Sequence, residues 1–286
     1  MPNPHPNSIA LIINADDFGF FAAVTKGIIQ CAQKSAISAT GIMANGPRFD
    51  EFKNQLIDLT HIDIGVHLNL TYGEPLSKNC RRHGAMQGGC FRPKIETAAL
   101  VLQKSLSASD VKAEWRSQID RCLDAGLNLH FLNSHEHIHI LPALTRIIQE
   151  LAHEYGIVHI RYPRPEWKRH PVTAKNFLRN LLMHIAIGLN KNFPTDSLIH
   201  VLGINVSGRL SFEYLSACFN RLIPGQVYEL MCHPGHFDPE EMKHASLNHF
   251  HLWQQELEVL TSPALAAQMR KQHLHLARFS ILKQGA

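Results

Sequence analysis

The sequence predicts one α/β domain in which parallel strands and surrounding helices form a (β/α) barrel. Short apolar runs alternate with segments of helical periodicity, and there are about eight such runs. The length of 286 residues suits a barrel that folds as one domain, so we assign residues 1–286 to a single domain. The runs predicted as strands are Ile9–Ile13, Ala39–Ala44, Ile62–Val66, Leu129–Leu132, Ile157–Ile160, His200–Ile204, Val227–Met231 and Phe279–Leu282.

Capping residues mark the predicted helices between these strands. Asp110 should cap a helix that Gly126 ends, and Pro142 should begin a second helix. Ser211 and the pair Ser262–Pro263 should begin two more. The pattern therefore alternates strand and helix along most of the chain.

Two long segments separate these elements and resemble insertions: Tyr72–Lys94 and Pro163–Ser197. Long connections in a compact domain are often functional lids, so we interpret 163–197 as an insertion or cap. Within it, Thr173–Asn190 has the pattern of an amphipathic helix. The simpler interpretation is a helix packed on the barrel, and the alternative is an interfacial helix that contacts a membrane beside the site.

The composition excludes several classes of protein. With 45% hydrophobic and 18% charged residues the chain should be soluble and globular, and a net charge of +4 gives no strong support for nucleic-acid binding. The six cysteines form no C-x-x-C pair, and the first residues lack the pattern of a secretory signal. We therefore expect a cytoplasmic protein, and the lack of a long apolar run predicts no transmembrane segment.

Polar residues follow five of the predicted strands, where the carboxyl ends of parallel strands should converge on one face. A lone histidine at such a place is often structural or at the surface, but five strands together are harder to attribute to chance. These residues are Asp16, Asp17, His67, His135, Arg161 and His233.

The motif Asn14–Gly19 places two adjacent carboxylates at the end of an apolar strand. Because like charges repel and burial disfavours them, a cation is expected beside Asp16 and Asp17. The alternative is that one of them caps the following helix.

Two imidazoles and one carboxylate form a ligand set that suits Zn²⁺ with an open position for water, although other divalent metals accept it too. In the run Ser134–His139, an extended chain would place His135, His137 and His139 on one side. Only His135 lies directly at the end of the strand, so we choose it as the ligand and expect the other two to support the site or lie at the surface.

The chain resembles the YdjC-like carbohydrate deacetylases over nearly its whole length. The matching stretches, in family order, are NADDFG (14–19), ANGP (44–47), GVHLNLTYGEPL (65–76), LNSHEHIHILP (132–142), IRYPRP (160–165) and CHPG (232–235). The resemblance implies a barrel related to the wider NodB-type polysaccharide deacetylases. It also implies a hydrolase that removes acetyl groups from N-acetylated sugars with one divalent metal ion, Mg²⁺ or Zn²⁺.

The same resemblance implies a role for each residue of the site. By it, Asp17, His67 and His135 bind the metal, and Asp16 is the base that takes a proton from a metal-activated water. His233 is then the acid that protonates the departing amine, and Arg161 holds the base.

The substrate implied is an N-acetylglucosamine-type sugar, either a free oligosaccharide or a sugar linked to a lipid. The spacer between Pro163 and Val201 is more similar to the branch associated with hopanoid biosynthesis than to the branch acting on chitin disaccharides. The acceptor of the sugar stays open between a free oligosaccharide and a lipid, peripheral membrane contact is one interpretation, and a homodimer is compatible with the sequence.

Two other functions have the same ligand set. A sugar-binding protein with a silent metal site would need neither Asp16 nor His233. A two-His-one-carboxylate Fe(II) enzyme usually has a jelly-roll fold, which the alternating pattern disfavours. The sequence contains no G-x-S-x-G, G-x-G-x-x-G or P-loop motif, so neither a serine hydrolase of that type nor a nucleotide-binding protein is expected.

Overall fold

Eight strands form one parallel sheet in the computed structural model, which describes residues 8–82, 86–165, 174–194, 199–242 and 251–282. The sheet order is β7-β6-β3-β2-β1-β9-β8, and β10 pairs with the first part of β1. The strands are β1 (Ile9–Phe18), β2 (Ala39–Ile42), β3 (Asp63–Leu68), β6 (Leu129–Ser134), β7 (His159–Ile160), β8 (Ile199–Leu202), β9 (Val227–Cys232) and β10 (Leu274–Leu276).

The sheet curves into a barrel that is open on one side. Within the described residues, β7 and β8 stand at the two ends of the strand order and do not pair with each other. The chain between them contains α7 (Ala174–Gly188), so the segment that we interpreted as an insertion connects the two strands beside the opening. The predicted parallel (β/α) barrel is thus confirmed as the type of fold, in a partly open form.

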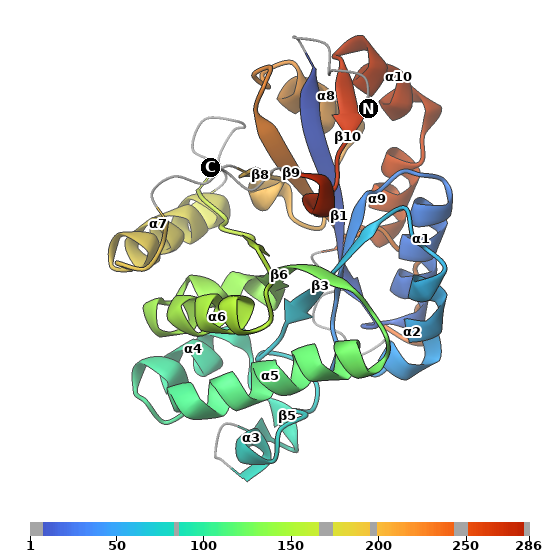
Figure 1. The fold of residues 1–286 in the computed structure, drawn as a ribbon. Helices are drawn as coiled ribbons and strands as arrows, with labels where there is room; N and C mark the ends of the chain where they lie inside the picture. The colour runs from blue at the N-terminus through green and yellow to red at the C-terminus, as the bar shows by residue number, and fades with distance from the viewer. Residues whose placement is uncertain (1–7, 83–85, 166–173, 195–198, 243–250, 283–286) are drawn as a thin grey trace.

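Helices surround the sheet, and β1 runs through the middle of the molecule (Figure 1). Helix α5 packs against both α6 and β3, and α1 packs against β1 and α9. The remaining short elements include a hairpin of β4 (Met86–Gln87) and β5 (Cys90–Phe91). The helices are α1 (Ala22–Gln33), α2 (Phe49–Ile57), α3 (Lys78–Arg82), α4 (Lys94–Leu102), α5 (Ala108–Asp124), α6 (Pro142–Glu154), α7, α8 (Phe212–Phe219), α9 (Trp253–Leu260) and α10 (Pro263–Lys271).

Most of the predicted helix starts are confirmed. Pro142 is the first residue of α6, and the hydroxyls of Ser211 and Ser262 accept backbone N–H bonds at the starts of α8 and α10. The prediction for α5 was wrong by one turn, because Ser107 is the cap and accepts from the N–H of Asp110. Both are helix-start residue types, and the serine lies first in the chain.

The last predicted strand was also wrong. Residues Phe279–Ile281 form a 3₁₀ turn, η4, and β10 lies upstream of it. The turn is held because the carboxylate of Asp63 accepts hydrogen bonds from the backbone N–H and the hydroxyl of Ser280. Phe279 meanwhile stacks on Phe131 with ring centroids 4.5 Å apart, so it fills a gap in the core instead of extending a strand.

The core lies between the sheet and its helices, and the apolar runs that predicted the strands supply most of it. Trp115 of α5 and Phe18 of β1 are fully buried. No described helix is both long enough and apolar enough to cross a membrane.

Candidate active site

The polar residues that follow the strands converge at the carboxyl end of the sheet, as the sequence predicts. Asp16 and Asp17 lie in β1, His67 lies in β3, and His135 directly follows β6. Arg161 follows β7 and His233 follows β9, and each of these six side chains belongs to a residue that is at most 6% exposed. A buried group of this polarity needs internal partners, because water does not solvate it.

A bulge in β1 brings two adjacent carboxylates into the same site. Successive side chains of a regular strand point to opposite faces, so Asp16 and Asp17 would normally diverge. The register between β1 and β2 shifts between Ala15 and Phe18, and Asp17 adopts a positive φ of 72°. A residue with a positive φ at a bulge changes the direction in which its side chain points, and aspartate adopts a positive φ more readily than most residues do. This also corrects the capping alternative, since neither aspartate caps α1: the carboxylate of Glu241 accepts hydrogen bonds from the backbone N–H groups of Ala22 and Ala23 at the start of that helix.

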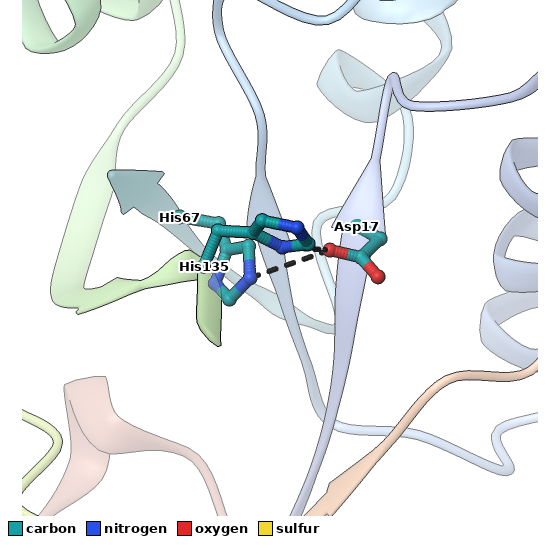
Figure 2. Close-up of side chains that lie close together, drawn as sticks. All are labelled: Asp17, His67 and His135. Atoms are coloured by element: carbon teal, nitrogen blue, oxygen red, sulfur yellow. Dashed lines mark hydrogen bonds and ion pairs between the residues drawn. The ribbon is translucent and has the colours of Figure 1, made fainter. Parts of the chain in front are cut away.

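Asp17, His67 and His135 form a group that is able to hold a metal ion. Their ligand atoms all lie within 4.8 Å of one another. Oδ1 of Asp17 is 3.3 Å from Nε2 of His67 and 3.1 Å from Nδ1 of His135. Figure 2 shows the two imidazoles and the carboxylate pointing toward one another from three segments of the chain. Two imidazole nitrogens and a carboxylate oxygen are ligands that Zn²⁺ and related divalent metals accept.

The electrostatics of this group fit a cation. Burial raises the pKa of Asp17, but His135 and His67 outweigh burial and hold the pKa well below its usual value. Burial lowers the pKa of His135, but Asp17, together with Glu136 and Asp16, outweighs burial, so the pKa is raised. The carboxylate therefore stays ionised in the interior and requires positive charge beside it, which a divalent ion would provide.

Asn133 orients the ring of His67 and contacts Asp16 at the same time. Its Nδ2 donates to Oδ1 of Asp16 at 2.9 Å, so its Oδ1 is the atom 2.7 Å from Nδ1 of His67. An amide oxygen only accepts, so Nδ1 of His67 carries the proton and Nε2 is left with a free lone pair toward Asp17. That is the tautomer a metal ligand needs.

Arg161 lies between two buried carboxylates and holds Asp16. Its guanidinium donates to both oxygens of Asp16, with Nη2 3.1 Å from Oδ1, and its Nε donates to Glu229 at 2.7 Å. Burial raises the pKa of Asp16, but Arg161 and then His67 lower it more, so the pKa lies below its usual value. Asp16 is thus an ionised acceptor that is held on one side by Arg161.

The segment after His135 does not follow the predicted alternation. Glu136 and His137 have φ of 53° and 57°, so the chain turns through η1 (His135–Ile140) instead of continuing as a strand. His139 consequently points back to the scaffold. Its Nδ1 meets the hydroxyl of Ser134, and its Nε2 donates to the carbonyl of Arg161 at 2.8 Å. It therefore fixes the start of the segment that carries Arg161.

His233 is buried and its backbone is anchored. Its N–H donates to Oε2 of Glu256 in α9 at 2.5 Å, and the same carboxylate accepts from the N–H of Leu210 at 3.0 Å. Its charge contributes to the lowered pKa of Asp16, so it lies within electrostatic range of that carboxylate. The structure thereby brings together all six residues predicted from the strand ends.

Sequence reasoning missed several residues that build the site, among them Gly41, Asn133, Glu229 and Glu256. A Cβ at Gly41 would lie 3.0 Å from Oδ1 of Asp16 and 3.3 Å from Cβ of His67, so glycine makes room for the site. Glu229 could have been noticed, because it is an acidic residue inside the apolar run Val227–Met231. Glu256 lies in a helix with other polar residues, and nothing in its local sequence singles it out.

A cleft of about 750 Å³ opens beside the metal-binding group at His135. One wall comes from the predicted insertion, with Tyr72, Phe91 and Lys94, and the other includes Asn45 and Glu136. Aromatic side chains beside polar ones are the kind of surface that recognises small polar ligands, including sugars.

A family model described as YdjC-like protein matches residues 10–271, and the chain therefore belongs to this family. A carbohydrate deacetylase of Clostridium beijerinckii is 26% identical over 273 residues, which cover 94% of this chain and 98% of that protein. A carbohydrate deacetylase of Vibrio parahaemolyticus is 30% identical over 285 residues, with 95% and 96% covered. A crystal structure from Enterococcus faecalis V583, provisionally assigned to cellobiose-phosphate cleavage, shares the fold with a TM-score of 0.75, 22% identity, and coverage of 96% and 98%.

Replacing any one of Asp17, His67 or His135 by alanine should lower the metal content of the purified protein, because each provides one of three ligand atoms. Elemental analysis by mass spectrometry measures metal per chain, and His153→Ala, an exposed residue of α6, is the matched control. The melting temperature should stay close to that of the wild type. Full occupancy in all three variants would show that the metal lies elsewhere.

Proposed function

We propose that this protein is a metal-dependent hydrolase that removes the acetyl group from an N-acetylated sugar. The observation that supports it best is the division between the two adjacent carboxylates. Asp17 faces two imidazoles, while Asp16 is held by Arg161 and Asn133 and so is kept apart as a proton acceptor. The relatives described as carbohydrate deacetylases support the reaction and the class of substrate.

In the proposed mechanism a bound metal would activate the water, Asp16 accepts a proton and His233 donates one. Asp17, His67 and His135 would hold the divalent ion, which would supply Lewis-acid chemistry by lowering the pKa of a bound water and polarising the acetyl carbonyl. Asp16 accepts the proton of the attacking water, and the charge of Arg161 keeps the carboxylate ionised and in place. His233 gives a proton to the sugar nitrogen as the C–N bond breaks, so that a neutral amine leaves.

The identity of the metal and the setting of the protein are also part of the proposal. Zn²⁺ suits two imidazole ligands better than Mg²⁺, which prefers oxygen, so we favour zinc. A cytoplasmic location agrees with six cysteines that are all free thiols. A homodimer stays a prediction of the sequence.

The two alternative functions differ from this proposal in what they require. A sugar-binding protein with a silent metal site has no use for a carboxylate as firmly positioned as Asp16. An Fe(II) enzyme would consume O₂ and a cosubstrate, and its usual jelly-roll scaffold is not the parallel sheet found here. Acetate release without oxygen or a cosubstrate separates both from a hydrolase.

Asp16→Asn should retain the metal and lose acetate release by about 10²- to 10⁴-fold, because the amide keeps the shape but cannot accept the proton. His233→Ala should behave in the same way, with a smaller loss on substrates that have good leaving groups. Acetate and metal content are measured on the same samples, and Asp58→Asn, an exposed aspartate at the end of α2, is the control. Turnover of Asp16→Asn close to that of the wild type would disprove the assignment of the base.

For the acceptor of the sugar we propose a lipid, on the basis of an apolar groove next to the cleft. The groove has a volume of about 330 Å³ and is lined by Leu178, Leu182 and Met183 of α7 and by Ile138 and Leu141. Lys94 and Glu136 line both the groove and the larger cleft, so the two hollows are neighbours. A sugar in the cleft would place an attached apolar group within reach of this groove.

Helix α7 has features of both interpretations made from its sequence. Met183 is buried against Ile204 and Met231, as expected of a packing helix. Several of its other large apolar side chains are exposed, namely Phe177, Leu178, Leu181, Leu182 and Ile185, and so is Leu189 directly after the helix. An exposed apolar surface of this kind beside a pocket fits peripheral contact with lipid.

The groove predicts selectivity for a lipid-linked N-acetylglucosamine over a free chitin disaccharide. Contact with a few hundred Å² of lipid contributes several kcal/mol at roughly 25 cal/mol per Å², before ordering costs are subtracted. Leu178→Ser with Leu182→Ser should reduce kcat/KM for the lipid-linked sugar only. The control pair is Ile57→Ser with Ile223→Ser, which are exposed apolar residues that lie outside α7 and do not line the groove.

Two results would contradict the lipid proposal. One is equal kcat/KM for the lipid-linked and free sugars in the wild type. The other is a groove variant that loses activity on both substrates alike, since that would make α7 a packing helix only. Either result leaves the deacetylase proposal intact, because acetate release is measured in both arms.

A further inference from the structure

His251 lies two residues before the start of α9, and its ring contacts the ring of His233. The two ring centroids are 4.6 Å apart and the planes are inclined at 85°, so one ring presents its edge to the face of the other. His251 also lies close enough to Asp17 and His135 for their charges to act on its pKa. It is therefore a residue of the candidate site, although no motif of the sequence indicates it.

The ring of His251 is itself fixed from two further sides. It stacks on Trp253, which is 2% exposed, with centroids 5.2 Å apart and planes inclined at 22°. Gly208 lies against the ring, and a Cβ there would be 2.9 Å from its Cγ and Nδ1. The backbone N–H of Leu252 donates to the carbonyl of Gly208 at 2.7 Å, which ties the two segments together.

His233, in contrast, has few contacts that could fix its ring. Glu256 holds the backbone N–H of this residue but does not touch the imidazole in any hydrogen bond among the described residues. Nδ1 of His233 is buried and has no hydrogen-bond partner there, and the same is true of Nδ1 of His251. A hydrogen bond through Nδ1 is the usual way to orient a catalytic histidine, so packing must replace it here.

Packing against a neutral ring is compatible with an acid that must carry a proton. Burial lowers the pKa of His251 to about 3, and His233 acts in the same direction. His251 therefore stays neutral and adds no positive charge against a protonated His233. An edge-to-face contact of two rings also restricts rotation without any proton exchange between them.

We propose that His251 is a positioning residue for His233: its ring, clamped between Trp253 and Gly208, packs against the imidazole of the acid and fixes the plane of that ring. The inference rests on the proposed function, in which His233 protonates the leaving amine. It assigns the role to the shape of the His251 ring and not to its nitrogens.

The test compares His251→Ala, which removes the ring, with His251→Phe, which keeps an aromatic ring of similar width. His251→Ala should lower kcat for an N-acetylated sugar by about tenfold or more, because a misplaced acid loses part of the 10²- to 10⁴-fold that acid catalysis is worth, while KM changes little. His251→Phe should restore most of kcat. The control is His275→Ala, an exposed histidine in β10.

Two further readouts separate positioning from a general structural effect. The loss in His251→Ala should nearly vanish on 4-nitrophenyl acetate, whose leaving group needs no proton. The double variant with His233→Ala should be no slower than His233→Ala alone, since both changes remove the same contribution. Additive losses, or a phenylalanine variant as slow as the alanine variant, would overturn the proposal.

A measurement that needs no activity makes the outcome independent of the proposed function. Side-chain ¹³C relaxation of the His233 ring, assigned by its loss in His233→Ala, should show greater ring mobility in His251→Ala and wild-type rigidity in His251→Phe. Unchanged mobility in His251→Ala would overturn the positioning role. A wild-type protein that releases no acetate from any N-acetylated sugar would instead refute the proposed function and leave this relaxation result to decide on His251.

Discussion

The ion pair between Arg161 and two buried carboxylates is the interaction on which the rest of the site depends. Asp16 and Glu229 are each 1% exposed, and two unpaired carboxylates at this depth would be strongly destabilising. The planar guanidinium satisfies both at once, which a lysine could not do. Because these residues come from β1, β9 and the end of β7, the pair also ties together strands across the sheet and determines where Asp16 stands.

The bulge at Asp17 allows both adjacent carboxylates to lie in the site. It lets two neighbours in the sequence occupy one pocket while they have different partners, a cationic guanidinium for Asp16 and two imidazoles for Asp17. Asn133 then connects the two halves, because it donates to Asp16 and accepts from His67. A proton acceptor and a metal-binding group are thus held next to each other by a single chain of contacts, and in our proposal this arrangement defines the enzyme.

The parallel fold and the six residues at the strand ends could be predicted, because apolar runs and the polar residues that follow them are local features of the sequence. The left-handed turn after His135 could not, since it depends on where the segment must join α6, and neither could the 3₁₀ turn η4, whose place is decided by Asp63 and Phe131. His251 was missed for the same reason. Gly208 and Trp253 hold the ring of His251 in place, and no periodic pattern in the sequence links these residues to His233.

Anomalous diffraction from a crystal grown with Zn²⁺ would show whether the two adjacent aspartates have separate roles. We expect one strong peak at zinc-ligand distance, about 2.0–2.2 Å, from Asp17, His67 and His135. Asp16 should still be bound to Arg161 and lie outside that distance. A peak coordinated by Asp16 in place of Asp17, or one at a different group of residues, would show that the two aspartates do not have these roles.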